Sequence, residues 1–281
     1  MTLNPETALA VATEAALAAG KIVADGFSRP KEVAFKGEID IVTQYDLASE
    51  KQIMAMISRA FPEHDILTEE SGGKNTGAPF KWYVDPLDGT VNFAHGFPVF
   101  CISIACAAQT EHGPELLVGV VYDPMGKELF QAIKGRGAQV NGQALRIGDR
   151  ADLNQALVAT GFPYDLHQQP EPVLSRFRRM IMAVQGVRRP GSAALDLAWT
   201  AAGRFDGFWE ERLHPWDVAA GVLLVREAGG RCTDFKGNDF VLDAKEILAT
   251  NRLLHYNMLR ILKENTLDMD KSRAALPREG A

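Results

Sequence analysis

The sequence predicts a fold that mixes α-helices and β-strands, with an antiparallel sheet in its first half and an α/β pattern in its second half. Between residues 80 and 145, short runs rich in β-branched and aromatic residues alternate with turn signals, which is typical of an antiparallel meander. After about residue 152, strand-like and helix-like segments alternate along the chain. Because no Ser/Gly-rich linker separates the halves, we expect two subdomains that share one body.

The first elements are predicted by helix caps. Asn4 can cap a helix, and the alanine-rich run after it continues until Gly26. Thr43 followed by Asp46 three positions later forms a capping-box-like start for a second helix. Residues 36–40 form a polar loop between these two helices.

The remaining elements follow in order, and they define the predicted domains. The meander consists of KWYV, FPVFCISIACAA, LLVGVVYDP, ELFQAIKG and AQVNGQAL. The second half then reads as strand ALVATG, a helix over 173–184, helix SAALDLAWTAAG, strand FDGFWE, helix VAAGVLLVREAGG, strands RCTDF and ILATN, and a last helix after Leu253. We expect an N-terminal subdomain over 1–151, a C-terminal subdomain over 152–265 and a frayed tail over 266–281.

Composition and charge narrow the class of protein. Hydrophobic residues make up 46% of the 281 residues and charged residues 23%, which excludes a largely disordered chain. A net charge of -6 argues against nucleic acid as the main partner, although an association with RNA polymerase stays open. No apolar run approaches the roughly 20 residues of a membrane-spanning helix, so we expect no membrane partner. The N-terminus lacks signal-peptide features, and three cysteines without C-x-x-C spacing suit a reducing compartment, so we expect a cytoplasmic protein.

An apolar strand runs directly into two aspartates in WYVDPLDGTVNF. Pro86 forbids a hydrogen-bonded continuation of the strand, which leaves Asp85 and Asp88 at the strand end. Gly89 and Thr90 follow in a tight turn, whose N–H groups would face an anion if they opened a helix. Taken alone, the two aspartates could simply stabilise a turn, as Asp-Pro and Asp-Gly pairs commonly do.

Two more apolar segments also stop on acidic residues. ILTEES ends in Glu69 and Glu70, and HPWDVAAG places Asp217 at the start of a helix. Both have an ordinary alternative: Glu69 and Glu70 could be a solvated strand end, and Asp217 could be a helix N-cap. Converging carboxylates would repel each other by roughly 4 kcal/mol per pair at 4 Å, so only cations make such a cluster tolerable. All-oxygen ligands without paired His or Cys favour Mg²⁺ or Mn²⁺ over zinc.

These motifs resemble those of a known family. DPLDGTVNFAHGFP, with EES upstream and WDVAAGVLLVREAGG downstream, is similar to the signatures of the inositol monophosphatase family of Mg²⁺-dependent, lithium-sensitive phosphatases. The similarity extends from the first helix to ILATN. It implies a layered α-β-α-β-α sandwich of the sugar-phosphatase type, a homodimer, and hydrolysis of a small phosphate monoester.

The resemblance also implies roles for particular residues. Glu69, Asp85 and the carbonyl of Leu87 would hold one Mg²⁺, while Asp85, Asp88 and Asp217 would hold a second. A third, weaker ion would lie near Glu69. Lys36 and Asp40 could help to hold it, but the sequence favours a plain surface loop for these two residues. Thr90, backed by Asp46 and Glu69, would orient the attacking water. The substrate would be bound by Leu87, Asp88, Gly89, Thr90, Arg188, Gly191, Ser192, Ala193, Glu210 and Asp217.

Three functions remain open on the sequence. The first is an inositol-1-phosphate phosphatase, which the N-F-x-H-G-F-P continuation after DGTV favours. The second is a sister phosphatase that acts on fructose 1,6-bisphosphate, histidinol phosphate or a 3'-phosphoadenosine nucleotide. The third is a phosphatase with an additional regulatory role on transcription or RNA machinery, because some bacterial relatives are implicated in binding it.

Overall fold

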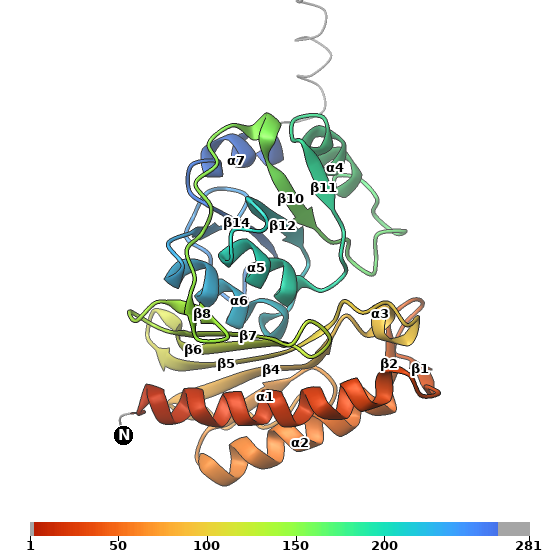
Figure 1. Cartoon of the computed structure of the whole chain (residues 1–281), viewed down its shortest axis with the longest axis vertical. Coiled ribbons are helices and arrows are strands. Elements are labelled where there is room, and N and C mark those ends of the chain that lie inside the picture. Colours follow the sequence, from red (N-terminus) through yellow and green to blue (C-terminus); the bar gives the residue numbers. More distant parts are fainter. Residues whose placement is uncertain (1–2, 264–281) are drawn as a thin grey trace, which may run out of the picture.

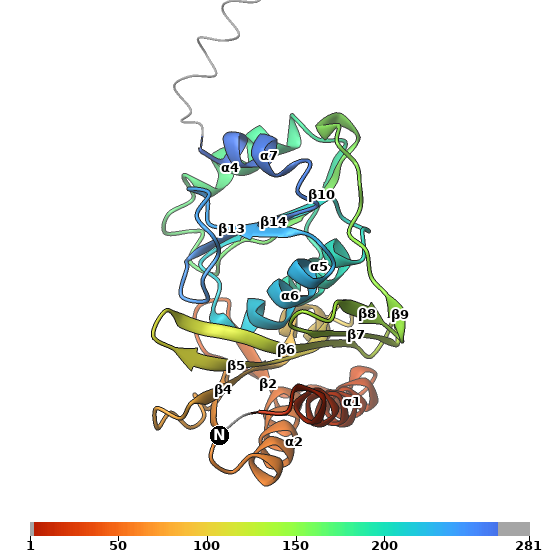
Figure 2. The same ribbon diagram turned by 90° about the vertical axis from the view of Figure 1, so that its left-hand side faces the viewer.

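The computed structural model describes residues 3–263, which form five stacked layers (Figure 1). Helices α1 and α2 form the first layer, and a seven-stranded sheet lies against them. Helices α5 and α6 separate this sheet from a five-stranded sheet, and α4 and α7 cover the outer face of the second sheet (Figure 2). The predicted α-β-α-β-α sandwich is therefore confirmed.

Six helices of the described residues lie in predicted segments, whereas the short α3 and the 3-10 helix η1 were not predicted as segments. Their bounds are α1 (Pro5–Phe27), α2 (Gln44–Ala60), α3 (Thr90–Ala94), α4 (Val173–Ile181), α5 (Ala193–Ala201), α6 (Pro215–Glu227) and α7 (His255–Lys263), with a short 3-10 helix η1 (Leu153–Gln155). Both predicted caps are present. Asn4 Oδ1 accepts a hydrogen bond from Thr7 N at 3.1 Å, and Thr43 and Asp46 form a capping box at the start of α2.

The first sheet contains the predicted meander. Its strands, in spatial order, are β3 (Asp65–Thr68), β4 (Phe80–Asp88), β5 (Cys101–Thr110), β6 (Gly113–Asp123), β7 (Glu128–Ile133), β8 (Ala138–Val140) and β9 (Gln143–Ala144). Neighbours from β4 to β9 pair antiparallel, whereas β3 pairs parallel with β4. The parallel pair brings the C-terminal ends of β3 and β4 together, so the segments after them lie side by side.

The second sheet is mixed. Its strands, in spatial order, are β11 (Gly186–Arg188), β10 (Leu157–Thr160), β12 (Gly207–Glu211), β14 (Glu246–Thr250) and β13 (Arg231–Thr233). The sequence did not predict β11, nor the hairpin of β1 (Val33–Phe35) and β2 (Ile41–Thr43) around the predicted loop. Each of these strands has three residues, too few for an alternating pattern to show.

Helix α1 packs its alanine stripe against the first sheet and α2. Its buried residues include Ala8, Ala12, Ala15, Ala19 and Val23, spaced to face one side of the helix. By length and apolar composition α1 could also cross a membrane, which the sequence analysis did not foresee. Here the small side chains serve close packing between α1, α2 and the strands β5 and β6.

Helix α6 lies between the two sheets, and its side chains from Val218 to Val225 are buried. Close contact with the first sheet requires a glycine in β6, because a Cβ at Gly119 would lie 3.0 Å from the carbonyl oxygen of Ala220. This contact sets the distance between the layers. It therefore also fixes where the start of α6 lies relative to the end of β4.

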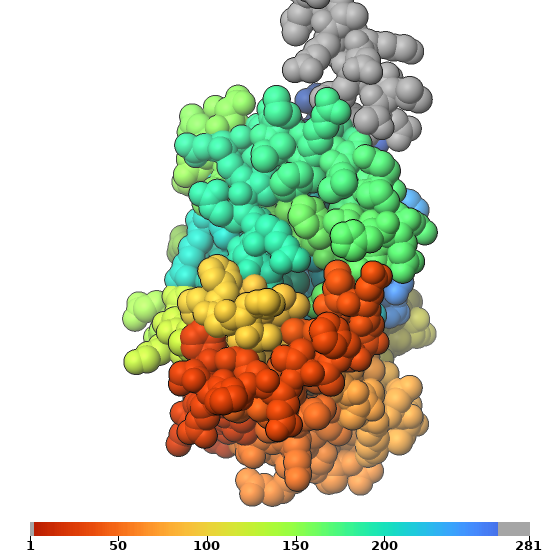
Figure 3. All heavy atoms as spheres, turned by 90° about the vertical axis from the view of Figure 1, so that its right-hand side faces the viewer, coloured from red at the N-terminus to blue at the C-terminus, as the bar shows by residue number. Residues whose placement is uncertain are grey.

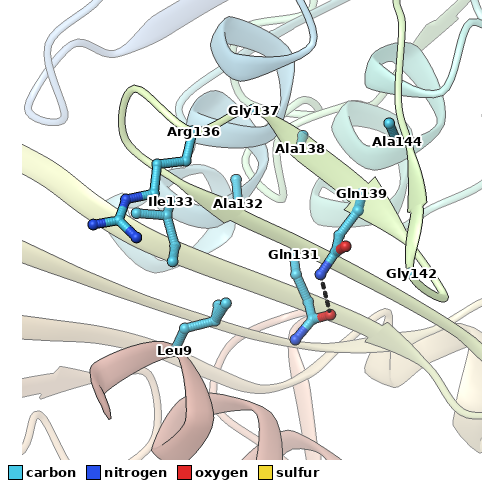
Figure 4. A pocket seen from close by; sticks show the side chains of 10 residues that line it. All are labelled: Leu9, Gln131, Ala132, Ile133, Arg136, Gly137, Ala138, Gln139, Gly142 and Ala144. Atoms are coloured by element: carbon cyan, nitrogen blue, oxygen red, sulfur yellow. Dashed lines mark hydrogen bonds between the residues drawn. The ribbon is translucent and has the colours of Figure 1, made fainter. Parts of the chain in front are cut away.

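A hollow of about 240 Å³ lies where α1 faces the strands β7 and β8 (Figure 4). Leu9 lines it from the helix, and Gln139 donates a hydrogen bond to Gln131 across the strands. None of the acidic residues singled out in the sequence lines this hollow. It is separate from the predicted site.

The chain passes from the first sheet to the second between β9 and β10, over residues 145–156. This crossing includes the boundary proposed at 151/152, which stays a prediction. The proposed frayed tail, 266–281, lies outside the described residues.

We predict that His255 makes the fold sensitive to acid. Its ring nitrogens lie 2.9 Å from Thr233 Oγ1 and 2.8 Å from Thr250 Oγ1 in the core. Burial, aided by the charge of Arg231, lowers the pKa of His255 to about 4 from the usual 6.5. Between these two values the unfolded state binds the proton and the folded state does not, so stability falls as pH falls from 6.5 to 4.

Urea unfolding at several pH values between 7.5 and 4 would measure this loss. We expect His255→Asn to flatten the pH dependence, by up to about 1.4 kcal/mol per pH unit. The exposed His112, changed to Gln, is the control and should keep the wild-type slope. An unchanged slope in His255→Asn would refute this account of the core histidine.

Candidate active site

The Asp-Pro-Leu-Asp turn at the end of β4 is held rigidly by its neighbours. The pairing of β4 with β5 shifts register between Asp85 and Asp88. Leu87 N donates to Asp85 Oδ1 at 3.0 Å, and Ser49 Oγ of α2 donates to the carbonyl of Pro86 at 2.6 Å. Asp85 is only 2% exposed, so its carboxylate is fixed in the interior.

The turn continues through a glycine that no other residue could replace without strain. Gly89 has a φ of 97°, and a Cβ there would lie 2.9 Å from the carbonyl oxygen of Val99 and 3.2 Å from that of Gly191. Helix α3 begins at the next residue, Thr90. Because the first N–H groups of a helix lack intrahelical partners, this turn meets the predicted requirement for an anion.

Thr90 joins the turn to α2. Its hydroxyl oxygen lies 2.7 Å from Asp46 Oδ1 and 2.9 Å from the carbonyl oxygen of Leu87. The other oxygen of Asp46 accepts from Thr43 N at 2.9 Å. Burial raises the pKa of Asp46, and the bonds from Thr43 and Thr90 oppose this shift. The residues predicted to orient water are thus brought together.

The segment after β3 is anchored by Glu50, a residue that the sequence analysis did not single out. Glu50 Oε2 accepts from Glu70 N at 2.9 Å, and Glu50 Oε1 accepts from Ser71 N at 3.1 Å. Thr68 Oγ1 also donates to Glu50. A signal existed in the sequence, because Asp46, Ser49 and Glu50 share the helix face that continues as the buried Ile53 and Ile57.

The acidic residues Glu69, Glu70, Asp85, Asp88 and Asp217 are called the acidic cleft below. A lysine from the β1–β2 hairpin contacts two of them. Lys36 Nζ lies 2.7 Å from Glu69 Oε1, 3.0 Å from Glu70 Oε1 and 3.7 Å from Asp40 Oδ1. Burial alone would lower the pKa of Lys36, but the charges of Glu69 and Glu70 raise it well above its usual value. Lys36 therefore contacts the Glu69 region, which a plain surface loop would not do, while a role of Lys36 and Asp40 at a third ion stays a prediction.

The remaining two aspartates are held by donors from the second half of the chain. Ser192 Oγ and Ala194 N, at the start of α5, each donate to Asp88 Oδ2 at 2.7 Å. His214 N donates to Asp217 Oδ2 at 2.7 Å. His214 is the N-cap of α6, and Asp217 completes the capping box from position N3, so the N-cap role that the sequence left open for Asp217 belongs to His214.

The four carboxylates share one electrostatic neighbourhood. Burial is the largest cause that raises the pKa of Asp85 well above its usual value, followed by the charges of Glu69, Asp88 and Asp217. Burial likewise raises the pKa of Asp88 to about 6 and that of Asp217 well above its usual range. Glu69 also has a raised pKa because it is buried, although Lys36 opposes the shift.

The carboxylates are near one another, yet they do not form a ready metal cage. Among residues 3–263, no group of three or more His, Cys, Asp and Glu side chains is arranged to hold an ion. The hydrogen bonds give the reason, because these carboxylates accept from protein groups. Asp88 accepts from Ser192, Asp217 from His214 N and Glu69 from Lys36. The predicted ligands therefore share one neighbourhood without being arranged as a metal site among the described residues, and their role as ligands stays a prediction.

Beyond the carboxylates lies a second polar region, formed by β12, α5 and the end of β10. Burial raises the pKa of Glu210 to about 8, and the charge of Asp88 adds to this effect. Asp196 of α5 is 1% exposed, and its Oδ1 has no hydrogen-bond partner among the described residues. Burial and the charge of Glu210 raise its pKa well above the usual value, which favours the neutral acid.

The residues predicted to bind the alcohol part of a substrate divide into two groups. Gly191, Ser192 and Ala193 lie at the start of α5 next to Asp88, as predicted. Arg188 is exposed and donates to the carbonyl of Val187, whereas the charge of Arg189 acts on Glu210 and Asp196. The arginine nearer to these carboxyl groups is thus the neighbour of the one predicted.

A five-layer fold with acidic strand ends meeting beside a helix start defines a phosphatase. The chain belongs to the inositol monophosphatase family, whose model matches residues 4–267. It is 41% identical over 259 residues to an inositol-1-monophosphatase of Synechocystis, covering 92% of this chain and 89% of that protein. It is 43% identical over 252 residues to a Nus factor SuhB of Pseudomonas aeruginosa, covering 86% and 91%. The solved inositol monophosphatase of Anabaena superposes with a TM-score of 0.83 at 42% identity, covering 92% of this chain and 96% of that one.

We predict that Glu50→Gln weakens both the fold and the phosphatase activity. The amide keeps the volume of the side chain but replaces one acceptor oxygen with a donor, which would face N–H groups of Glu70 and Ser71. We expect the free energy of unfolding to fall by about 1 to 3 kcal/mol, with reduced activity because Glu69 loses its anchor. Urea unfolding and phosphate release would measure the two effects.

The matched control is Glu63→Gln, a change at an exposed glutamate just after α2. It should leave both measurements at the wild-type level. If Glu50→Gln behaved in the same way as the control, Glu50 would not be the anchor of the segment after β3.

Proposed function

We propose that this protein hydrolyses phosphate monoesters with Mg²⁺ as its cofactor and Mn²⁺ as a substitute. The preferred substrate would be myo-inositol 1-phosphate, with myo-inositol and phosphate as products. One observation carries this proposal: the carboxylates of Glu69, Asp85, Asp88 and Asp217 come from distant segments and share one electrostatic neighbourhood, in which Asp85 is buried and the other three are half-buried. Such a concentration of negative charge is stable with cations and costly without them.

The chemistry of the cleft suits a divalent cation. Its donors are carboxylate and carbonyl oxygens, which Mg²⁺ prefers, and the Lys36 ammonium already lies there between Glu69 and Glu70 as a cation. Glu69, Asp85 and the carbonyl of Leu87 would hold one ion, and Asp85, Asp88 and Asp217 a second. A third, weaker ion would lie near Glu69. When bound, such ions lower the pKa of water and neutralise the charge that develops on the phosphate.

The residues of the turn would position the reacting groups. The Thr90 hydroxyl lies within donating distance of Asp46, which leaves an oxygen lone pair to accept a hydrogen bond from water. Asp46 and Glu69 would complete this orientation, while the N–H groups of Gly89 and Thr90 bind phosphate oxygens. The water oxygen would then bond to phosphorus as the opposite P–O ester bond breaks. The attacking water would release one proton to solvent, and the departing alkoxide would take one proton from a solvent water, so that the products are the alcohol and phosphate. No covalent enzyme intermediate is needed.

The region around Glu210 would bind the alcohol part of the ester. Gly191, Ser192 and Ala193 border it from α5, and Arg188 and Asp217 complete the proposed set. The Synechocystis relative named inositol-1-monophosphatase supports inositol as the alcohol. Fructose 1,6-bisphosphate, histidinol phosphate and a 3'-phosphoadenosine nucleotide are the alternative esters.

A phosphate-release panel with these four substrates tests the proposal. With Mg²⁺ we expect the fastest release from myo-inositol 1-phosphate, and EDTA should abolish it because the carboxylates lose their cations. Added Li⁺ should inhibit the reaction, as the family resemblance implies. The variant Asp88→Asn tests the assignment of the metal ligands. It should lower kcat/KM at least about tenfold, equivalent to about 1.4 kcal/mol in the barrier.

Two results would contradict the proposal. Full activity in EDTA would show that the reaction needs no metal ion. Wild-type rates in a folded Asp88→Asn variant would show that Asp88 is not a metal ligand. Faster phosphate release from one of the other esters would still support the proposed hydrolysis but would identify a different preferred substrate.

A second candidate function is a regulatory role in transcription, because a relative at 43% identity is named Nus factor SuhB. If this chain shares such a role, a pull-down against RNA polymerase and ribonucleoprotein should recover a partner. Repeating it with and without Mg²⁺ shows whether the association depends on the acidic cleft. Recovery of no partner in either condition would rule this function out.

Assembly and location complete the proposal. A homodimer is expected from the family resemblance. The three cysteines, Cys101, Cys106 and Cys232, are free and buried, which agrees with a cytoplasmic location.

A further inference from the structure

We infer that Arg231, Arg252 and Asp239 form a second ligand site, which binds the phosphate group of a small polyol ester. The three side chains line one hollow of about 400 Å³ at the edge of the second sheet. None of the residues of the acidic cleft lines this hollow. The inference therefore goes beyond the proposed function and does not need the metal ions of the acidic cleft.

The pairing of the last two strands brings the two arginines together. The edge strand β13 begins at Arg231, which pairs with Thr250 at the end of β14. Arg252 follows two residues after Thr250, and its Nε donates to the carbonyl of Gly230 at 3.3 Å. The guanidinium of Arg252 thus lies against the backbone just before Arg231, and both arginines line the same hollow.

The backbone at Arg252 is fixed in an unusual conformation. Its φ of 69° lies in the left-handed region, which favours glycine and strains other residues. Bonds on both sides hold it there, because Arg252 N donates to Thr250 Oγ1 at 3.3 Å and His255 N donates to the carbonyl of Arg252 at 3.2 Å. The arginine therefore leaves the end of β14 at a defined place, and the hollow does not depend on a free loop.

The carboxylate of the hollow is held on the other side of β13. Asp239 pairs with Thr233 of β13 through an isolated antiparallel bridge. The turn between these residues is closed by Asp234, whose Oδ1 accepts from Asn238 N at 2.8 Å. The edge strand therefore lies between the segment that carries Asp239 and the strand that leads to Arg252.

The donors of this hollow are unused within the protein. Among residues 3–263, the Arg231 side chain forms no hydrogen bond or ion pair, and the Arg252 side chain bonds only through Nε. Neither arginine forms an ion pair with Asp239 in this part of the chain. The hollow thus offers two planar forks of N–H donors and one acceptor.

This combination selects a phosphate ester that also carries a hydroxyl group. A phosphate monoester has a charge of about −2 and three acceptor oxygens, so it can bind both guanidinium groups at once, whereas a carboxylate matches a single fork. The carboxylate of Asp239 would repel an anion, but it accepts a hydrogen bond from a neighbouring hydroxyl of the same molecule. A polyol ester meets both requirements.

The hollow lies away from the acidic cleft. Asp217 is in the first turn of α6, and Arg231 follows four residues after this helix ends. Because the 13 residues of α6 extend about 20 Å, the two sites lie at opposite ends of the helix. Figure 3 shows the face with the orange-red hairpin, where blue segments appear only at the margins, and Figure 2 shows β13 and β14 from the opposite side. A ligand in the hollow would leave the acidic cleft open to substrate.

Binding of inorganic phosphate to the full chain, measured by calorimetry, tests the site. In EDTA the acidic cleft has no metal ion and repels phosphate, so we expect wild type to bind one phosphate with a Kd of about 1 mM or lower. Arg231→Gln and Arg252→Gln should each raise this Kd at least about tenfold, the effect of losing a charge-assisted hydrogen bond. Arg59→Gln, at an exposed arginine at the end of α2, is the matched control and should keep the wild-type Kd.

The class of ligand is tested with myo-inositol 1-phosphate under the same conditions. We expect wild type to bind the ester more tightly than inorganic phosphate, because a hydroxyl of the ester donates to Asp239. In Asp239→Ala this preference should disappear, while inorganic phosphate should bind more tightly because a negative charge has left the hollow. In wild type, the Nε–H signals of Arg231 and Arg252 in NMR spectra should shift when either ligand is added.

Any of three results would overturn the inference. They are no binding of phosphate to wild type in EDTA with unmoved arginine signals, equal Kd values in wild type and both arginine variants, and an unchanged preference for the ester in Asp239→Ala. The same titration with Mg²⁺ separates this site from the proposed function, since a further phosphate should then bind at the acidic cleft. If only that further phosphate were missing, the proposed function would be contradicted and the second site would still be supported.

Discussion

Mutual repulsion among buried carboxylates is the constraint on which the rest of the structure depends. Two such charges 4 Å apart repel by about 4 kcal/mol at an effective dielectric of 20, and burial adds the cost of lost hydration. The raised pKa values of Asp85, Asp88 and Asp217 express this cost in the molecule. A fold that assembles these groups must hold each one with donors, because otherwise the acidic segments would separate.

The groups that hold these acidic segments come from several elements around the cleft. Helix α2 holds the backbone: Ser49 donates to the carbonyl of Pro86, and Glu50 accepts from the N–H group of Glu70. The start of α5 contributes from above through Ser192 and Ala194, which donate to Asp88. The hairpin adds the positive charge of Lys36. The position of each carboxylate is thus over-determined, which is what a catalytic site that works by placement and charge requires.

The sequence predicted the fold closely where the local signals are strong. Caps at Asn4 and Thr43 gave the first two helices, and turn pairs such as Asn141-Gly142 gave the meander. The three-residue strands β1, β2 and β11 were missed, because they show no local period, whereas β8 and β13 of the same length lie in longer strand-like runs. Among the site residues, the acidic strand ends were visible, since charge after an apolar run is unusual. Glu50 was marked only by the helix face that it shares with Ile53 and Ile57, and the burial of Asp196 depends on what packs against its helix.

The two halves of the chain are joined through the site itself. A boundary near residue 151 separates the strands of the first sheet from those of the second. The cleft, however, takes Asp85 from β4, Asp217 from α6 and the donors of Asp88 from α5. If the halves moved apart, Asp88 would lose Ser192 and Ala194, and its charge would stay half-buried without partners, which costs more than the contacts alone. The acidic cleft therefore couples the sheets, so a topological boundary here is not a functional one.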